Sequence, residues 1–226
     1  MKLFNTTALA CVIAVMGVSA ANAGVVIGGT RVIYEGSKKE ASLSVNNPDT
    51  VPYLIQSWIE NQNGGAEKAS FVITPPLFRL DQGEKNIMRI VKTGAQAEDK
   101  ESMYWLNIKS IPSAPKKEIN TLQVAVKTRI KLIYRPEGLK GKSSEDFAQQ
   151  LTWQKVGNQI QVTNSSNYYM NFNEITVAGK KLPAVTYVAP GQSSKFDLPA
   201  GVSGGAVTFK LISDFGGVNP AHQASI

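Results

Sequence analysis

The sequence predicts an all-β protein made of two β-sandwiches of the immunoglobulin type that follow one another along the chain. Short segments of alternating apolar and polar residues recur between Gly, Pro, Asn and Asp clusters, and helical periodicity is nearly absent. Many short strands with such turn signals are typical of sandwiches. A polar and basic stretch at 138–145 separates two series of these segments, so we expect two domains, the second smaller.

The first series consists of short candidate strands bounded by turn signals. The signals include Glu35-Gly36, the Asn-Asn-Pro-Asp run at 46–49, the Asn-Gly-Gly run at 63–65 and Pro75-Pro76. Between them the alternation predicts strands at 25–34, 40–45, 53–60, 71–74, 78–80, 86–92 and 103–108.

A longer segment, LQVAVKTRIKLIYRP at 122–136, follows this series. Its even positions are almost wholly apolar, and most of its odd positions are polar or basic. A strand of that length would run about 50 Å, against a usual length of about 20 Å. Such a strand outgrows its own sheet, so we expect part of its apolar face to be an interaction edge.

The second series begins after a break at Arg135-Pro136-Glu137-Gly138. One helical turn is predicted at 144–149, with Ser143 or Ser144 as its N-cap. The alternation then predicts strands at 150–156, 159–164, 170–177, 186–188, 194–198 and 206–213.

The N-terminus has the features of a cleaved signal peptide. Lys2 provides a positive start, residues 8–20 are apolar and uncharged, and the Ala-Asn-Ala run at 21–23 fits the A-x-A cleavage pattern. A membrane anchor is the alternative, but the apolar run is short for a span. We expect an exported chain with a signal peptide at 1–23, an N-terminal domain at 24–138, a linker at 139–144 and a C-terminal domain at 145–226.

The composition argues against several functions. Cys11 is the one cysteine and leaves with the signal peptide, so the mature chain has no thiolate chemistry. Removing Lys2 lowers the formal charge from +7 to +6, but the basic residues are scattered along strands, which argues against nucleic acid. His222, in a tail predicted to be frayed, has no metal-ligating cluster near it. We expect no catalytic residue, metal, cofactor or small-molecule substrate, and therefore no enzyme. The tryptophans are expected in the cores: Trp58, Trp105 and Trp153.

Several motifs in a fixed order resemble those of one family. They are IKLIYRP at 130–136, YLIQSWIE at 53–60, TPP at 74–76, ESMYWLN at 101–107 with Ile111-Pro112 after it, and DFGG at 214–217. Together they resemble the periplasmic pilus chaperones of the chaperone–usher pathway, over about residues 30–217. The stretch at 113–121 is short, which resembles the short-loop branch of that family, serving rod-like pili.

The resemblance implies a function that is not catalytic. Members have two immunoglobulin-like domains in a boomerang arrangement, and they lend their long edge strand to pilus subunits that lack the last strand of their own sandwich. An added strand satisfies the subunit's unpaired backbone groups while alternate side chains fill its groove. By resemblance, Leu122, Val124 and Val126 are the lent side chains, and Arg31 and Lys131 anchor the C-terminal carboxylate of the subunit.

Three further residues match the family's buried interdomain ion network: Glu101, Arg135 and Asp214. Buried ion pairs often add little net stability, so orienting the domains is the more plausible role. The Asp214 assignment is open, because Asp-Phe-Gly-Gly suits a turn equally well.

The partners implied are pilus (fimbrial) subunits and an outer-membrane usher, in the periplasm of a Gram-negative bacterium. Self-association that caps the exposed edge is a further hypothesis. Two alternatives stay open. A structural fimbrial subunit or adhesin would usually carry a cysteine pair and an alternating N-terminal extension, and the mature chain has neither. A carbohydrate-binding module or hydrolase is the other, and it lacks a placed catalytic pair.

Overall fold

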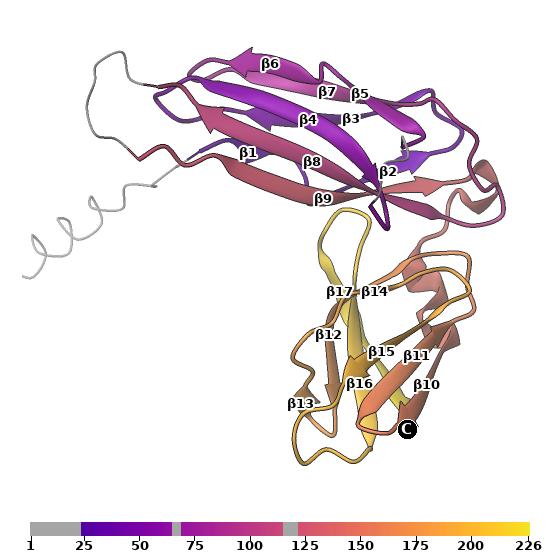
Figure 1. Cartoon of the computed structure of the whole chain (residues 1–226). Helices are drawn as coiled ribbons and strands as arrows, with labels where there is room; N and C mark the ends of the chain where they lie inside the picture. Colours follow the sequence, from indigo (N-terminus) through magenta and orange to yellow (C-terminus); the bar gives the residue numbers. More distant parts are fainter. Residues whose placement is uncertain (1–23, 65–68, 115–121) are drawn as a thin grey trace, which may run out of the picture.

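The computed structural model describes residues 24–64, 69–114 and 122–226, which form two β-sandwiches set at an angle like the arms of a boomerang (Figure 1). The prediction of an all-β fold with two sandwiches is confirmed. The expected signal peptide, 1–23, lies outside the described residues. In the part of the chain that the structure describes, no helix is long and apolar enough to cross a bilayer.

The N-terminal sandwich consists of two sheets, with strand orders β1-β3-β7-β5 and β2-β9-β8-β4-β6. Adjacent strands are antiparallel except β2, which runs parallel to β9. The strand bounds are β1 Val26–Ile27, β2 Arg31–Glu35, β3 Glu40–Asn46, β4 Tyr53–Asn61, β5 Phe71–Thr74, β6 Leu77–Leu80, β7 Lys85–Lys92, β8 Ser102–Pro112 and β9 Val126–Arg135.

The first predicted strand, 25–34, is in fact two strands in different sheets. β1 pairs with β3 and β2 with β9, so the chain changes sheets at 28–30. A Cβ on Gly28 would lie 2.1 Å from Oγ of Ser44, and glycine alone permits this close approach. The single-strand prediction is wrong here, because alternation along the chain does not reveal which sheet each half joins.

β9 is also shorter than predicted, at Val126–Arg135 instead of 122–136. Its pairing with β8 begins at Ser110 opposite Val126, and β8 ends at Pro112. Residues 122–125 are therefore not part of any ladder among the described residues. The side-chain alternation continues through them, but a strand also needs a backbone partner.

The C-terminal sandwich follows two short 3-10 helices, η1 (Glu137–Leu139) and η2 (Ser144–Gln150). η2 confirms the predicted helical turn, and the amide of its N-cap Ser143 donates to Asp146 Oδ2 at 2.7 Å. The sheets have the orders β10-β11-β15 and β13-β12-β16-β17, with β14 beside β12. Their bounds are β10 Leu151–Val156, β11 Gln159–Asn164, β12 Met170–Val177, β13 Lys180–Lys181, β14 Tyr187–Val188, β15 Ser193–Asp197, β16 Ala206–Ile212 and β17 Val218–Ser225.

The predicted frayed tail is a strand, β17, which pairs with β16 along its length. His222 stacks on Phe209 with ring centroids 5.2 Å apart, and its Nε2 lies 2.7 Å from Oε1 of Glu145 in η2. Pro220 obscured the strand in the sequence, but β17 is an edge strand, where proline is tolerated. His222 thus joins the last strand to η2.

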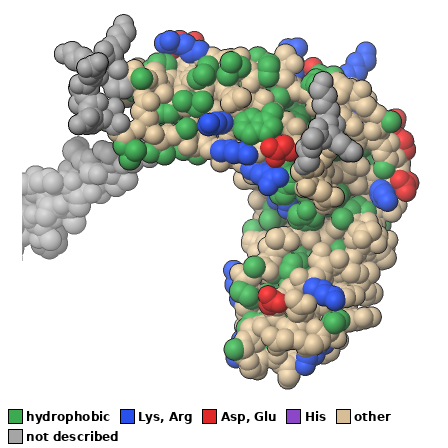
Figure 2. All heavy atoms as spheres, in the orientation of Figure 1, with side chains coloured by type: hydrophobic (Ala, Val, Ile, Leu, Met, Phe, Trp, Pro, Cys, Tyr) green, Lys and Arg blue, Asp and Glu red, His purple; other side chains and the backbone are tan. Residues whose placement is uncertain are grey.

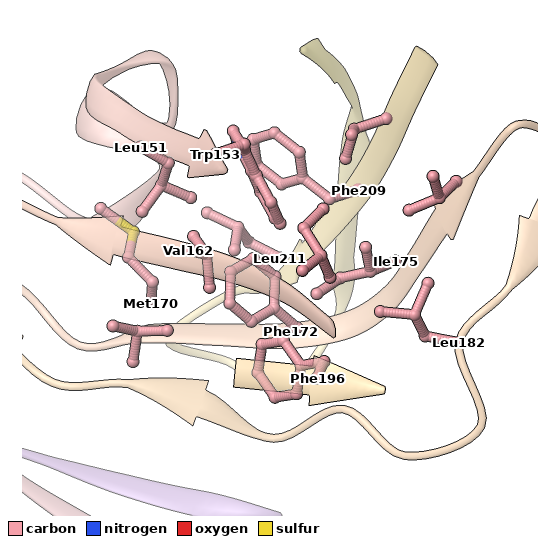
Figure 3. Close-up of a cluster of buried hydrophobic side chains, with 14 of the residues drawn as sticks. Leu151, Trp153, Val162, Met170, Phe172, Ile175, Leu182, Phe196, Phe209 and Leu211 are labelled. Carbon is pink, nitrogen blue, oxygen red and sulfur yellow. The ribbon is translucent and has the colours of Figure 1, made fainter. Parts of the chain in front are cut away.

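Each sandwich has its own apolar core. In the C-terminal sandwich four aromatic rings lie in contact, with centroids 5.1 to 6.0 Å apart; Figure 3 shows them at the centre of the cluster. They are Trp153, Phe172, Phe196 and Phe209. In the N-terminal sandwich the corresponding layer includes Val45, Ile55, Met88, Ile90, Leu106 and Leu132.

The two sandwiches meet at a buried ion network. Arg135, at the end of β9, donates from Nε to Glu101 at 2.7 Å and from Nη1 and Nη2 to Asp214 at 2.6 and 2.9 Å. Glu101 also accepts the amide of Tyr169 at 2.7 Å. Burial disfavours the charge of Arg135, but the bonds and charges of the two carboxylates outweigh it and raise its pKa. Asp214 lies both in the β16–β17 turn and in the network, so the two interpretations of its motif hold together.

An apolar cluster shared by both domains lies beside this network. It consists of buried Met103, Ile133 and Tyr169, with Ile33, Trp105, Tyr187 and Ala189 packed against them. The angle between the sandwiches is therefore held by packing as well as by charge.

Removing the carboxylate of Glu101 is expected to destabilise the protein far more than breaking an exposed ion pair. In Glu101→Ala, Arg135 stays buried with one partner fewer, and the amide of Tyr169 loses its acceptor. We expect the free energy of unfolding to fall by roughly 3–5 kcal/mol in urea unfolding. The control is Arg79→Ala, because Arg79 contacts Asp81 at the same 2.7 Å on the surface; there we expect a loss below about 1 kcal/mol. Equal losses would contradict the importance of the buried network.

Candidate functional site

The N-terminal part of β9 has an open edge. β8 pairs with β9 from Val126 onward, whereas β2 pairs with it only from Lys131 to Arg135. On the side where β2 lies, the backbone groups of β9 before Lys131 therefore have no strand beside them in the described chain. An open edge of this kind is a template for another strand.

The residues leading into this edge expose an apolar series. The exposed fractions of Leu122, Val124 and Val126 are 91%, 61% and 54%, which are high values for aliphatic residues. Val124 and Val126 also line a hollow of about 110 Å³ at the open end of the sandwich, together with Ile27 and Tyr53. No register shift interrupts the β8–β9 pairing, so within β9 Val126 lies on the face opposite to Lys127, Arg129 and Lys131.

The open edge ends at two basic residues. Arg31 is the first residue of β2 and lies directly beside Lys131 in the parallel register. Like charges side by side on a sheet repel each other. Arg31 and Lys131, the two residues expected by resemblance to anchor a carboxylate, are thus neighbours although they are 100 positions apart in the sequence.

The second domain completes the surroundings of this pair. Lys131 Nζ donates to Oδ1 of Asn171 and lies 4.7 Å from the ring centroid of Tyr187. Arg31 Nη1 donates to the carbonyl of Ile212 at 3.4 Å, while its buried Nε has no hydrogen-bond partner among the described residues. Sequence reasoning missed Asn171, Tyr187 and Ile212, because no local pattern shows which residues of the second domain face the first.

Both cations are partly desolvated. Burial, and then the charge of Arg31, lower the pKa of Lys131 from 10.5 to about 8. Burial also lowers the pKa of Arg31, against the opposing effect of Asp214. Within the described ranges no carboxylate forms a salt bridge with either residue. The pair therefore favours an incoming anion, and a carboxylate suits its donors.

Two of the three tryptophans lie outside the cores of the two sandwiches, contrary to the prediction, although Trp105 packs against the apolar cluster between the domains. Trp153 is buried, but Trp58 and Trp105 are only partly buried on the outward face of the sheet. The side chains of Lys127 and Arg129 cover them, at 4.9 and 4.2 Å from the ring centroids. Alternation in the sequence assigns a residue to one of two faces of a sheet but does not say which face packs into the core. In the sequence, aromatic residues that lie under basic side chains therefore look like core residues.

The geometry of the open edge determines the direction in which an added strand would run. A strand added to the open edge would lie in line with β2, on the same side of β9, and would have to stop where β2 begins. Its C-terminal carboxylate can reach Arg31 and Lys131 only if it runs parallel to β9, as β2 does. The site can thus hold an extended chain by its backbone, its apolar side chains and its terminus.

Comparison with known proteins shows the family of this chain. Residues 24–140 match the family described as pili and flagellar-assembly chaperone, PapD N-terminal domain, and residues 146–223 match pili assembly chaperone PapD, C-terminal domain. The chain is 42% identical over 220 residues to the chaperone protein LpfB of Salmonella typhimurium, covering 95% of this chain and 94% of that protein. It is 38% identical over 212 residues to the chaperone protein FimC of Escherichia coli K12, covering 92% and 86%.

Solved structures of pilus chaperones are also similar to this chain. A chain in the complex of the Salmonella enterica SafA pilin with the SafB chaperone matches with a TM-score of 0.82 at 34% identity, covering 92% of this chain and 99% of that chain. The Escherichia coli chaperone DraB matches with a TM-score of 0.79 at 37% identity, covering 89% and 95%. The chain therefore belongs to the PapD-like family of pilus-assembly chaperones.

Proposed function

We propose that this protein is a periplasmic chaperone that completes unfinished pilus subunits with its own edge strand and delivers them to an outer-membrane usher. The observation that carries the proposal is the open edge of β9, which starts at an exposed apolar series and ends at a desolvated pair of cations. Leu122, Val124 and Val126 would fill the groove of the subunit, and Arg31 and Lys131 would bind its C-terminal carboxylate. The match to the pilus-assembly chaperone family and the pilin bound to the related SafB chaperone support this assignment.

Export is part of the proposal. We infer that residues 1–23 are removed and that the mature chain starts at Gly24, with an N-terminal domain to 138, a linker at 139–144 and a C-terminal domain from 145. The buried network of Glu101, Arg135 and Asp214 would hold the two domains at the angle that brings Asn171 to Lys131. A second copy of the chain would suit the same open edge when no subunit is bound. The loop expected to mark the short-loop branch, 113–121, lies mostly outside the described residues.

Co-expression in the periplasm with the fimbrial subunits encoded beside this protein, followed by pull-down, tests the function. We expect the wild type to recover a subunit that is degraded without it. Lys131→Met keeps the side-chain stem but removes the charge that would hold the carboxylate, so recovery should fall roughly tenfold to a hundredfold. The matched control is Lys155→Met, an exposed lysine on β10. Undiminished recovery with Lys131→Met would overturn the anchor assignment.

The donor positions can be tested without disturbing the fold. In Leu122→Ser/Val124→Ser the free energy of unfolding should change by less than about 0.5 kcal/mol, since both side chains are exposed in the free protein. Capture of the subunit should fall at least tenfold, because each lost Leu or Val removes about 1.5–3 kcal/mol of burial in the complex. Gln123→Ser, at the position between the two donor residues, is the control for subunit recovery. An equal loss with that control would sink the donor assignment.

The basic pair should also make the free protein less stable than it would be without Lys131. Because the pKa of Lys131 is about 8 in the folded protein and 10.5 ordinarily, the unfolded chain binds more protons in that window. The contribution of Lys131 to the free energy of unfolding therefore rises as the pH increases from about 8 to 10.5. Below pH 8, the free energy of unfolding of Lys131→Met should be higher than that of the wild type by roughly 1–3 kcal/mol. This difference should shrink as the pH approaches 10.5.

Urea midpoints of both proteins across this pH range provide the measurement. The comparison of variant with wild type removes the titration of the other lysines and tyrosines. A variant that is less stable than the wild type below pH 8, or a difference that grows with pH, would contradict the desolvated state of Lys131.

A further inference from the structure

One side chain of the N-terminal domain bridges two tyrosines of the second domain. Gln62 directly follows β4, and its Oε1 accepts the hydroxyl of Tyr169 at 2.8 Å, while its Nε2 donates to the hydroxyl of Tyr187 at 3.1 Å. The backbone carbonyl of Gln62 accepts Nε1 of Trp105 at 3.0 Å, which holds the main chain at the same point. Both polar groups of this side chain are thus used across the joint between the domains.

The two tyrosines link the two polar sites at the joint. Tyr169 donates its amide to Glu101 of the ion network at 2.7 Å. The ring of Tyr187 belongs to the surroundings of the basic pair, with its centroid 4.7 Å from Nζ of Lys131. The two rings also contact each other, with centroids 5.8 Å apart. Gln62 therefore binds the hydroxyl ends of two rings that connect the ion network to the basic pair.

The backbone alone gives the ring of Tyr187 little support. β14 is only two residues long and pairs with β12 beside Asn171. Asn171, which lies opposite Tyr187 in this pairing, is the other contact of Lys131. A ring on so short a strand can turn about its side-chain torsions unless its hydroxyl is also bound. The hydrogen bond from Gln62 holds that hydroxyl from the other domain.

The contact between Tyr187 and Lys131 matters because it lies where the charge is hard to keep. A tyrosine ring beside a lysine ammonium stabilises the charged form, and the effect is larger where the ammonium is desolvated, as it partly is here. Figure 2 shows Lys and Arg side chains in a row that leads to the bend, and hydrophobic side chains at the bend itself. A cation that is held in place there can receive a carboxylate without a further ordering cost.

We infer that Gln62 is a positioning residue of the carboxylate anchor. It keeps the ring of Tyr187 against Lys131 by binding the hydroxyl, and it ties that ring to Tyr169. The strength of the anchor therefore depends on a contact that exists only while the two domains are seated together. This inference rests on the proposed function and adds to it a residue that acts on the subunit's terminus through Tyr187 and Lys131.

Peptides with an alternating apolar series and either a free or an amidated C-terminus test this role, with the whole protein in calorimetry. The wild type should bind the free carboxylate more tightly, because Arg31 and Lys131 can hold it. Gln62→Met keeps the length of the side chain but loses both hydrogen bonds. We expect this variant to bind the free peptide roughly threefold to tenfold more weakly and the amidated peptide as before. The control Gln154→Met, at an exposed glutamine of β10, should change neither affinity.

Tyr187→Phe is a second variant, which keeps the ring and removes the hydroxyl that Gln62 binds. It should show the same selective loss, and Gln62→Met/Tyr187→Phe should lose no more than either single variant. In both single variants the pKa of Lys131, followed by NMR at its Cε, should fall below about 8, because a loosened ring stabilises the ammonium less. A pKa that stays unchanged in both variants would overturn the positioning role, and so would additive losses in the double variant.

The amidated peptide also separates this inference from the proposed function. If amidation weakens binding to the wild type, but Gln62→Met weakens both peptides equally or neither, the anchor stands and Gln62 is only a link between the domains. If amidation has no effect on the wild type, the anchor itself fails, and the role of Gln62 fails with it.

Discussion

The length over which β2 pairs with β9 determines where the open edge of the N-terminal sheet ends. β2 covers β9 only from Lys131 to Arg135, so the backbone before Lys131 remains open on that side. The same pairing sets Arg31 at the end of the edge and beside Lys131. A strand entering the edge is therefore limited in length, direction and register by a single feature, the start of β2. The change of sheet at Gly28 makes that start possible.

The joint between the sandwiches serves the same site. Arg135 ends the strand that carries the open edge, and its two carboxylate partners come from the residue before β8 and from the β16–β17 turn of the second domain. The second domain in turn supplies Asn171 and Tyr187 to Lys131, and the carbonyl of Ile212 to Arg31. At an interface between domains, a buried ion network is seldom more stable than apolar packing of the same volume, but it favours one arrangement of the domains.

Several features of this face are unfavourable for the isolated protein. Two cations are partly desolvated, a guanidinium nitrogen of Arg31 is buried without a partner in the described part of the chain, and apolar side chains at 122–126 are exposed. In the proposed complex each would become favourable, because an extended chain with an anionic end would supply charge, acceptors and apolar contact together. The cores of the two sandwiches, which are separate and well packed, provide the stability that tolerates these features.

The sequence by itself determined the class of fold, most strand positions, the helical turn capped by Ser143 and the alternating faces of β9. These follow from local chemistry: the period-two alternation, the turn residues and the motifs lie within a few residues of one another. Only the tertiary structure decided that 25–34 divides between two sheets, that β9 starts at Val126 and that the tail around His222 is an edge strand. It also placed Trp58 and Trp105 under basic side chains, and Asn171 beside Lys131. Each of these outcomes depends on which distant backbone or domain lies alongside, and the alternation of side chains in one segment contains no information about its partner.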